Sequence, residues 1–558
     1  NIYINMNKQQ LANKIWASAN KMRSKIDANE YKDYILGLIF YKFLSDNEVN
    51  YILKDMKGAS DEEKQAALES LVENYDDENS KVIIDYCKNN IGYFIEYKNL
   101  FSTWLQPNST FTVSDMSVAL NSFDRLISPN YKAVYNGIFK GLQAGLSKLG
   151  ENPASQTRAL KDLIKLIRDI PTDGSQDYDV LGYVYEYLIG NFAANAGKKA
   201  GEFYTPHEVA ILMSEIVAEH HKDKHQIEIY DPTSGSGSLL ITIGKSVGRH
   251  IADKNRVKYY AQELIENTYN LPRMNLVMRG IQPGNINTRC ADSLAEDWPI
   301  INSGSEIGQP LYVDAVVSNP PYSQHWDPKD RGGEEEQIRT RLIEKNNIDA
   351  IIGLPANIFF GTGIPTLVMV LKQHRDNDDV LIIDASKGFV KDGKQNKLRA
   401  CDIKKIADTV RDRKNIPGFS RKVSREEIRE NGYNLNIPRY VDSSEAAQPF
   451  DIYATMFGGI PNAEIDAMQK YWDTLPSLRS ALFQPEADKP YSALKVEDVK
   501  TAIEQNEDVR NFKMQFAQAF GGFADRLHQQ LIDHVMEVRE LQAQDEISTD
   551  IFRRLNPV

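Results

Sequence analysis

The spacing of hydrophobic residues changes twice along the chain and so separates three regions. In the first region, apolar residues recur at helical spacing, as at Leu11 and Ile15. Ser60 is followed three positions later by Glu63, which is the pattern of a capping box at a helix start. We therefore predict an all-helical N-terminal domain over residues 1–170.

The second region, residues 176–442, alternates short β runs with helical stretches. It follows a cluster of structure-breaking residues at 171–175. Alternation of strands and helices predicts βαβ units and a mostly parallel sheet, so the expected fold class is α/β. The predicted strands are 226–230, 257–261, 313–317, 349–354, 366–371 and 380–383.

The third region, residues 451–558, returns to helical spacing after a candidate linker at 443–449. An apolar seam follows the pair Gly521-Gly522. A narrow seam near a chain end is typical of a helix that docks on a partner or on its own chain. We predict a helical C-terminal region for subunit docking. The seam consists of Leu527, Leu531, Val535, Val538 and Leu541.

The composition limits the compartment and the partners. A net charge of -12 argues against a surface that contacts phosphates everywhere, but it allows a local basic cleft or a basic partner. The three cysteines lie too far apart for a disulfide framework or a close zinc pair, so we predict a cytoplasmic chain with no metal site. No apolar run reaches the ~18 residues of a membrane span. The first residues show no export signal, so no membrane partner is expected.

The first candidate site is the sequence D-P-T-S-G-S-G-S, residues 231–238, directly after a predicted strand. Glycines there let a ligand approach the backbone, and the next helix offers its N-terminus. Leu240 breaks a dinucleotide fingerprint, and Leu239 breaks a P-loop. The acidic opening residue favours S-adenosylmethionine, although a plain strand–turn–helix corner remains an alternative. The candidate cofactor contacts are Asp231, Thr233, Gly235, Ser236, Gly237 and Ser238.

Two acidic residues extend this candidate cofactor site. Glu263 follows the second predicted strand, where doubly wound folds bind a ribose diol, and the alternative is a solvated surface acid. Asp292 is placed to accept a hydrogen bond from the exocyclic amine of the cofactor's adenine, or it caps a turn.

The sequence N-P-P-Y, at Asn319, Pro320, Pro321 and Tyr322, follows the predicted strand 313–317. Two prolines give a rigid backbone with free carbonyls, Asn adds an amide oxygen, and Tyr adds a flat face. Together these groups can accept both hydrogens of an exocyclic amine and stack its ring. The amine nitrogen then attacks the methyl of a sulfonium in line. The alternative is an ordinary Pro-Pro end to a strand.

A further candidate segment, G-E-F-Y-T-P-H at residues 201–207, precedes the glycine loop. Thr205 is expected to cap a helix whose first turn contains Pro206. The same geometry points backbone amides and an aromatic pair toward a cofactor across the sheet. The candidate contacts are Glu202, Phe203, Tyr204, Thr205, Pro206 and His207.

The chain resembles the amino-methylating DNA adenine methyltransferases in the order of its motifs. These are G-E-F-Y-T-P, D-P-x-x-G-x-G-S, an acidic residue after the second strand, and N-P-P-Y. Over most of its length the chain is similar to the modification (M) subunits of type I restriction–modification systems. The resemblance implies a Rossmann-like S-adenosylmethionine-dependent domain that methylates N6 of an adenine flipped out of double-stranded DNA. It also implies Phe359 or Phe360 as a second stacking wall. The implied partners are a specificity (S) subunit, with two M per S, and a restriction (R) subunit.

The sequence departs from this family mainly after N-P-P-Y. The family has a further helix and strand before R-G-G-E-E, but here Asp330 meets Arg331 at once. A parallel crossover needs a dozen or more residues, so we expect a physical break between Ser323 and Arg331. The alternatives left open are a methyltransferase acting on RNA or protein glutamine, and a non-catalytic scaffold that clamps DNA.

Overall fold

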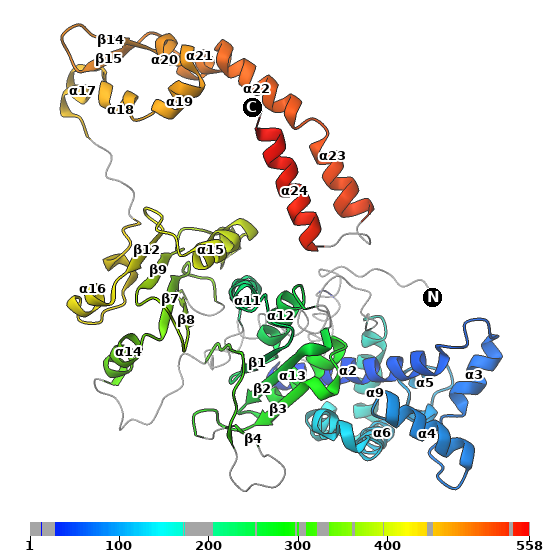
Figure 1. Ribbon diagram of the computed structural model, residues 1–558. Helices are drawn as coiled ribbons and strands as arrows, with labels where there is room; N and C mark the ends of the chain where they lie inside the picture. Colours follow the sequence, from blue (N-terminus) through cyan, green and yellow to red (C-terminus); the bar gives the residue numbers. More distant parts are fainter. Residues whose placement is uncertain are drawn as a thin grey trace. The chain divides into compact units, whose positions relative to one another are not determined.

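The structure is a computed structural model, and it divides the chain into two compact units, residues 1–443 and 444–558 (Figure 1). The division falls at the start of the predicted linker. In the part that the structure describes, no helix is long and apolar enough to cross a membrane. The described residues are 28–170, 205–251, 254–295, 298–300, 309–320, 334–359, 363–393, 395–443, 450–534 and 540–556, with Asn13 and Thr172.

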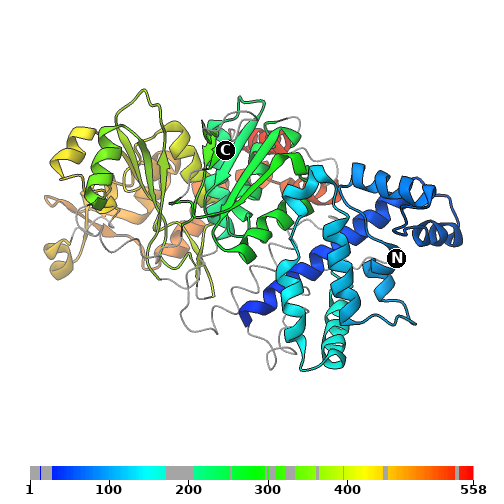
Figure 2. The same cartoon turned by 90° about the horizontal axis from the view of Figure 1, so that it is seen from below.

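The N-terminal part of the first unit is helical, as predicted. Ser60 and Glu63 form the predicted capping box at the start of α3. Figure 2 shows the long α2 helix, in dark blue, passing among the shorter helices. Aromatic rings fill their core, where Tyr41 stacks on Trp104 at 5.0 Å between centroids. The helices are α2 Ala28–Leu53, α3 Asp61–Glu69, α4 Glu78–Asn90, α5 Phe101–Trp104, α6 Val113–Arg125, α7 Lys132–Tyr135, α8 Lys140–Gly145 and α9 Pro153–Ile167.

The first sheet of the α/β part is wholly parallel and has the strand order β3-β2-β1-β6. Its buried positions share one hydrophobic core with the N-terminal helices. The helices α12 and α13 pack against the sheet and against each other. The elements are α11 His207–His220, β1 Ile227–Asp231, α12 Ser238–Val247, β2 Val257–Glu263, α13 Glu266–Met278, β3 Ile286–Cys290 and β6 Ala315–Val316, with a small hairpin of β4 Pro299–Ile300 and β5 Gln309–Pro310.

A second sheet has the order β12-β9-β7-β8, in which β7 and β9 are parallel and the two outer strands are antiparallel. The central strands are buried, except for the half-buried last residue of β9, as expected of strands covered on both faces. The elements are α14 Glu334–Glu344, β7 Ile348–Gly353, β8 Leu367–Leu371, β9 Val380–Asp384, β10 Val390–Asp392, β11 Gln395–Lys397, α15 Ala400–Asp412, β12 Ser420–Val423 and α16 Arg425–Glu430.

The two sheets share helix α11. Ala210 and Ala218 of α11 belong to the core of the first sheet, and Val209 and Leu212 belong to the core of the second. Among the described residues, no strand joins β6 to β8, and both strands carry exposed apolar side chains. The gap between the two sheets, from β6 to β8, lies at the place in the chain where the sequence lacks a crossover helix and strand. The predicted break between residues 323 and 331 itself lies outside the described residues.

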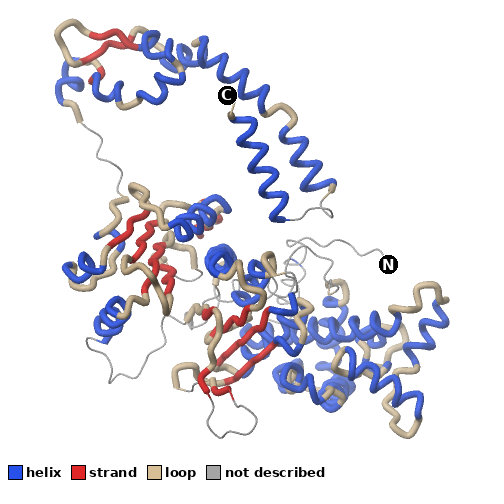
Figure 3. Tube along the Cα trace, viewed as in Figure 1, coloured by secondary structure: helices blue, strands red, loops and turns tan. Residues whose placement is uncertain are grey.

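The second unit is mainly helical, as predicted, and it also contains a three-stranded sheet, β13-β15-β14, which the sequence pattern did not predict (Figure 3). The predicted seam does not follow one helix, because α23 ends at His528 and a π-helical turn follows it; Val535 and Val538 lie outside the described residues. The elements are α17 Ile452–Phe457, β13 Ile460–Pro461, α18 Asn462–Asp466, α19 Gln469–Thr474, α20 Pro476–Leu482, β14 Phe483–Pro485, β15 Tyr491–Leu494, α21 Val499–Gln505, α22 Glu507–Ala519, α23 Phe523–His528 and α24 Glu540–Leu555.

Candidate active site

The candidate site lies at one edge of the parallel sheet. The strands β1, β2, β3 and β6 run in the same direction, so their carboxyl ends meet at this edge. Each end leads directly into a segment that the sequence analysis selected. These segments are the loop 231–238 after β1, Glu263 at the end of β2, Asp292 after β3 and Asn319 after β6.

The loop after β1 turns sharply before α12 begins. Gly235 and Gly237 have φ angles of +53° and +75°, a region in which a side chain is strained. The amide of Gly237 donates to the carbonyl of Ser234 at 2.7 Å. Gly237 also serves as the N-cap of α12. The loop therefore presents backbone rather than side chains toward the sheet edge.

Glu263 holds this loop from the neighbouring strand. Its Oε2 accepts a hydrogen bond of 3.0 Å from the amide of Gly235, and its Oε1 accepts one of 3.0 Å from the amide of Leu264. The preceding residue, Gln262, is fully buried, and its carbonyl accepts a hydrogen bond of 3.0 Å from the amide of Ser234. The carboxylate is thus fixed at the loop and is not a freely solvated surface acid.

Asp231 opens the loop and is 2% exposed. Burial raises the pKa of Asp231 to about 7, with a smaller contribution from the nearby charge of Glu263. The hydrogen bond of 3.0 Å from the amide of Thr233 to Asp231 Oδ1 opposes this shift. Asp231 therefore changes charge near neutral pH at a point where a cationic ligand would stabilise the ionised form.

The end of β6 is linked to the glycine loop. The hydroxyls of Ser318 and Thr233 share a hydrogen bond of 2.8 Å. Asn319, half buried, and Pro320, exposed, follow directly. Pro321 and Tyr322 lie outside the described residues. The link places the start of N-P-P-Y beside the loop predicted to contact the cofactor.

We expect Ser318→Ala to lower kcat for methyl transfer roughly three- to tenfold, because one hydrogen bond that positions Asn319 is lost. The affinity for S-adenosylmethionine should change less than twofold. Steady-state kinetics with DNA measure kcat, and calorimetry measures the affinity. Ser70→Ala removes a comparable hydrogen bond, to the carbonyl of Ala67, on the helical domain and serves as the control. An unchanged kcat in Ser318→Ala would contradict the linking role.

The remaining predicted contacts have mixed outcomes. Asp292 accepts a hydrogen bond of 2.9 Å from the amide of Leu294, so its carboxylate does cap a turn. The helix α11 begins at His207 with Pro206 as its N-cap, one residue later than expected, so the prediction of Thr205 as the cap is wrong. Glu202, Phe203 and Tyr204 lie outside the described residues.

Phe359 is 5% exposed and belongs to the core of the second sheet. It packs in the cluster that includes Leu212 of α11 and Ile403 of α15. Phe360 lies outside the described residues. Stacking of the target base on either ring stays a prediction.

Sequence reasoning missed one residue that supports the site. The side chain of Asn275, in α13, donates a hydrogen bond of 2.7 Å to the carbonyl of Ser236 in the glycine loop. Asn275 lies 39 positions along the chain from Ser236, and no local pattern marks it. Only the packing of α13 reveals this contact.

Comparison with known proteins identifies two families along the chain. The N-6 DNA Methylase family matches residues 176–332 and 330–448, two segments that meet where the crossover is missing. The HsdM N-terminal domain matches residues 11–167.

Individual relatives agree with these matches. The methylase subunit of the type I restriction enzyme MpnII from Mycoplasma pneumoniae is 31% identical over 505 residues, covering 79% of this chain and 90% of that protein. The MjaVIII methylase subunit from Methanocaldococcus jannaschii is 27% identical and covers 80% of each. The crystal structure of a type I methyltransferase subunit from Streptococcus thermophilus has a TM-score of 0.67 and 35% identity, covering 78% of this chain and all of that one. The chain therefore belongs to the methylase subunits of type I restriction–modification systems, and it is an adenine-specific N-6 DNA methyltransferase.

Proposed function

We propose that S-adenosylmethionine binds over the glycine loop 231–238 and that the target adenine enters beside Asn319. The observation that carries this proposal is the meeting of four selected segments at the carboxyl edge of one parallel sheet. In open α/β sheets, ligands bind outside this edge. The hydrogen bond between Thr233 and Ser318 holds the cofactor and base segments together.

The residues at this edge fit S-adenosylmethionine. Asp231 is buried, so a positively charged ligand would stabilise its ionised form. S-adenosylmethionine carries positive charge on its sulfur and on its amino group. Glu263 lies at the tip of the second strand, where a ribose diol donates to a carboxylate. The amides of the loop approach the ligand closely because Gly235 and Gly237 carry no side chain.

The remaining groups would prepare the adenine. The side-chain oxygen of Asn319 and the backbone carbonyl of Pro320 accept hydrogen bonds from the two N6 hydrogens. These two hydrogen bonds pull N6 toward tetrahedral geometry, so that its lone pair is less delocalised into the adenine ring and is available on nitrogen. The bound cofactor supplies an electrophilic methyl group on sulfonium. N6 would bond to the methyl carbon while the carbon–sulfur electron pair stays on sulfur, which leaves S-adenosylhomocysteine, and the proton released from N6 would pass to water. Positioning and electrostatics thus replace a strong base.

We further propose the assembly in which this chain works. Two copies would bind one specificity subunit, which reads the DNA sequence, and a restriction subunit would complete the complex. A flipped adenine is needed because N6 in a duplex is stacked and paired. The chain is acidic overall, with a net charge of -12, which agrees with a methylase that leaves most duplex contacts to a partner. Three dispersed, free cysteines suit the cytoplasm.

The test is a methyl-transfer assay with S-adenosylmethionine labelled on its methyl group. The full chain is purified alone and together with a specificity subunit. The label is then traced in duplex DNA by nucleoside analysis. We expect N6-methyladenine only when both subunits are present. Label on RNA or protein in place of adenine would overturn the proposal.

We expect Glu263→Ala to weaken binding of S-adenosylmethionine roughly ten- to hundredfold, because the charged acceptor for the ribose and for Gly235 is lost. S-adenosylhomocysteine should lose affinity to the same extent, because it shares the ribose and lacks only the methyl and its charge. Calorimetry with both ligands measures this. Glu69→Ala, on α3 of the helical domain, is the control. A loss confined to S-adenosylmethionine would contradict ribose binding by Glu263.

A further inference from the structure

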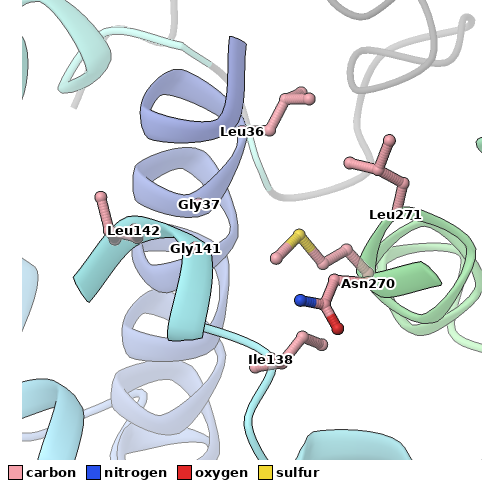
Figure 4. A pocket seen from close by; sticks show the side chains of 8 residues that line it. Leu36, Gly37, Ile138, Gly141, Leu142, Asn270 and Leu271 are labelled. Carbon is pink, nitrogen blue, oxygen red and sulfur yellow. The ribbon is translucent and has the colours of Figure 1, made fainter. Parts of the chain in front are cut away.

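Helix α13 packs against both the N-terminal helical domain and the glycine loop. Figure 4 shows a small pocket where Asn270 and Leu271 of α13 face Gly37 of α2 and Leu142 of α8. The side chains of Leu271 and Met274 are 6% exposed and belong to the core that both parts share. The helix therefore has one face in the helical domain.

Arg273 fastens this face. Its side chain is 3% exposed, and its Nη1 donates to the carbonyls of Val134 and Asn136 at 3.2 and 3.0 Å. Its Nη2 donates to Asn270 Oδ1. The ring of Tyr269 lies 4.4 Å from the guanidinium carbon and stabilises the charge. A buried guanidinium with several fixed acceptors holds a helix in one position, because its rigid planar fork suits only that arrangement.

The opposite side of α13 supports the glycine loop at two points. Asn275 is 4% exposed, and its Nδ2 donates to the carbonyl of Ser236 at 2.7 Å. Its Oδ1 has no hydrogen-bond partner among the described residues, so the bond to Ser236 alone sets the direction of the amide. Pro272 lies against Gly237, where a Cβ would come within 2.9 Å of the proline ring. The loop thus takes its shape partly from α13.

We propose that α13 couples the N-terminal helical domain to cofactor binding, with Asn275 and Arg273 as positioning residues. The inference rests on the proposed binding of S-adenosylmethionine at the loop. Asn275 holds the peptide of Ser236, and Arg273 fixes the helix that carries Asn275 to the helical domain. A movement of the helical domain, such as one caused by a subunit binding to it, changes the cofactor affinity through this helix.

The first test compares Asn275→Ala with Asn285→Ala in the full chain. Asn285 makes the same kind of bond, from Nδ2 to the carbonyl of Asn255 at 2.7 Å, but on the exposed surface away from the loop. We expect Asn275→Ala to raise both the Kd and the KM for S-adenosylmethionine roughly three- to tenfold. Its kcat at saturating cofactor should stay within twofold of wild type. Equal cofactor affinities in the two variants would overturn the role of Asn275.

The second test needs no cofactor. Arg273→Met keeps an unbranched apolar stem and removes the guanidinium with all its donors. We expect amide hydrogen exchange at residues 234–238 to become faster in the unliganded variant, in addition to any change at Val134 and Asn136. Exchange that increases only at Val134 and Asn136 would overturn the coupling. A wild-type chain that binds no S-adenosylmethionine would instead refute the proposed function, and this exchange measurement distinguishes the two failures.

Discussion

Asn319→Ala should reduce methyl transfer to adenine by a factor of about 10²–10³, the effect of removing one fixed polar partner from a developing charge. Asn319 lies shortly after β6, next to Ser318, and is brought beside the cofactor loop by the bond between Ser318 and Thr233. Its amide oxygen is one of two acceptors that would activate N6. Alanine leaves the cofactor segments in place, so binding of S-adenosylmethionine should change by less than threefold. Single-turnover methylation and calorimetry measure the two quantities separately.

Asn90→Ala provides the matched control. Asn90 lies at the end of α4, and its amide donates to the carbonyl of Tyr86 on the surface of the helical domain. Its loss should leave methyl transfer unchanged. If Asn319→Ala kept more than a tenth of the wild-type rate on adenine, the proposed activation of N6 would be refuted. If it lost cofactor binding instead, Asn319 would have to be assigned to the cofactor site.

The strands that carry the site could be predicted because they are short apolar runs. The prediction for 226–230 corresponds to β1, Ile227–Asp231, and that for 380–383 corresponds to β9, Val380–Asp384. Both lie inside their sheets, so burial selects hydrophobic residues along them. Central strands of this kind have a sequence pattern that resembles neither an amphipathic helix nor a loop.

The two strands missed in the four-stranded sheets lie at sheet edges. β3, Ile286–Cys290, is buried only at its first residue, and β12, Ser420–Val423, has exposed Arg421 and Lys422 in its middle. An edge strand with solvent on one side accepts polar residues, and such residues also discourage pairing with other chains. Their sequence pattern is therefore that of a loop, and only the pairing with β2 or β9 identifies them as strands.

The candidate site was predictable where it depends on local sequence and not where it depends on packing. The glycine loop 231–238 and Glu263 were recognised because each directly follows a strand. The contacts of Asn275 and Arg273 join segments 39 and 139 positions apart, and no local pattern encodes them. Phe359 shows that a local motif can also select a residue of the core. It was chosen from its motif as a stacking wall for the base, and it packs in the core of the second sheet.

The C-terminal seam shows how helical spacing can persist across a break. Leu527 and Leu531 keep the four-residue spacing, but Leu531 lies in the π-helical turn Gln529–Asp533. Such a turn has more residues per turn than an α-helix, so Leu531 does not continue the α-helical register of α23; Val535 and Val538 of the seam lie outside the described residues. Leu531 is 38% exposed. The four-residue spacing of Leu527 and Leu531 is therefore not evidence that both lie on one face of a single α-helix.

Asp231 gives the second large expected effect, which is a dependence of stability on pH. Its folded-state pKa of about 7 lies above the unfolded value, so the folded chain binds this proton more tightly. Protonated Asp231 contributes its full stabilisation of the folded state below about pH 3.8, and this contribution is lost as the pH rises through about 7. The contribution to the free energy of unfolding is on the order of 4 kcal/mol. Asp231→Asn keeps the acceptor for Thr233 and removes the charge. Without ligand, the variant should therefore gain stability relative to wild type as the pH rises from 5.5 to 8.5, as measured by thermal unfolding.

Cofactor affinity should follow the opposite trend, because a cationic ligand favours the ionised carboxylate that the empty site disfavours. In wild type we expect the Kd for S-adenosylmethionine to fall about tenfold per pH unit between pH 5 and 7 and then to level off. Asp231→Asn should bind weakly at every pH and show no such slope. Calorimetry at fixed ionic strength measures both proteins. Since Glu263 raises the pKa of Asp231, Glu263→Gln should move the midpoint of the wild-type curve to lower pH. A wild-type Kd that is constant between pH 5 and 8 would show that Asp231 does not face the charged part of the cofactor.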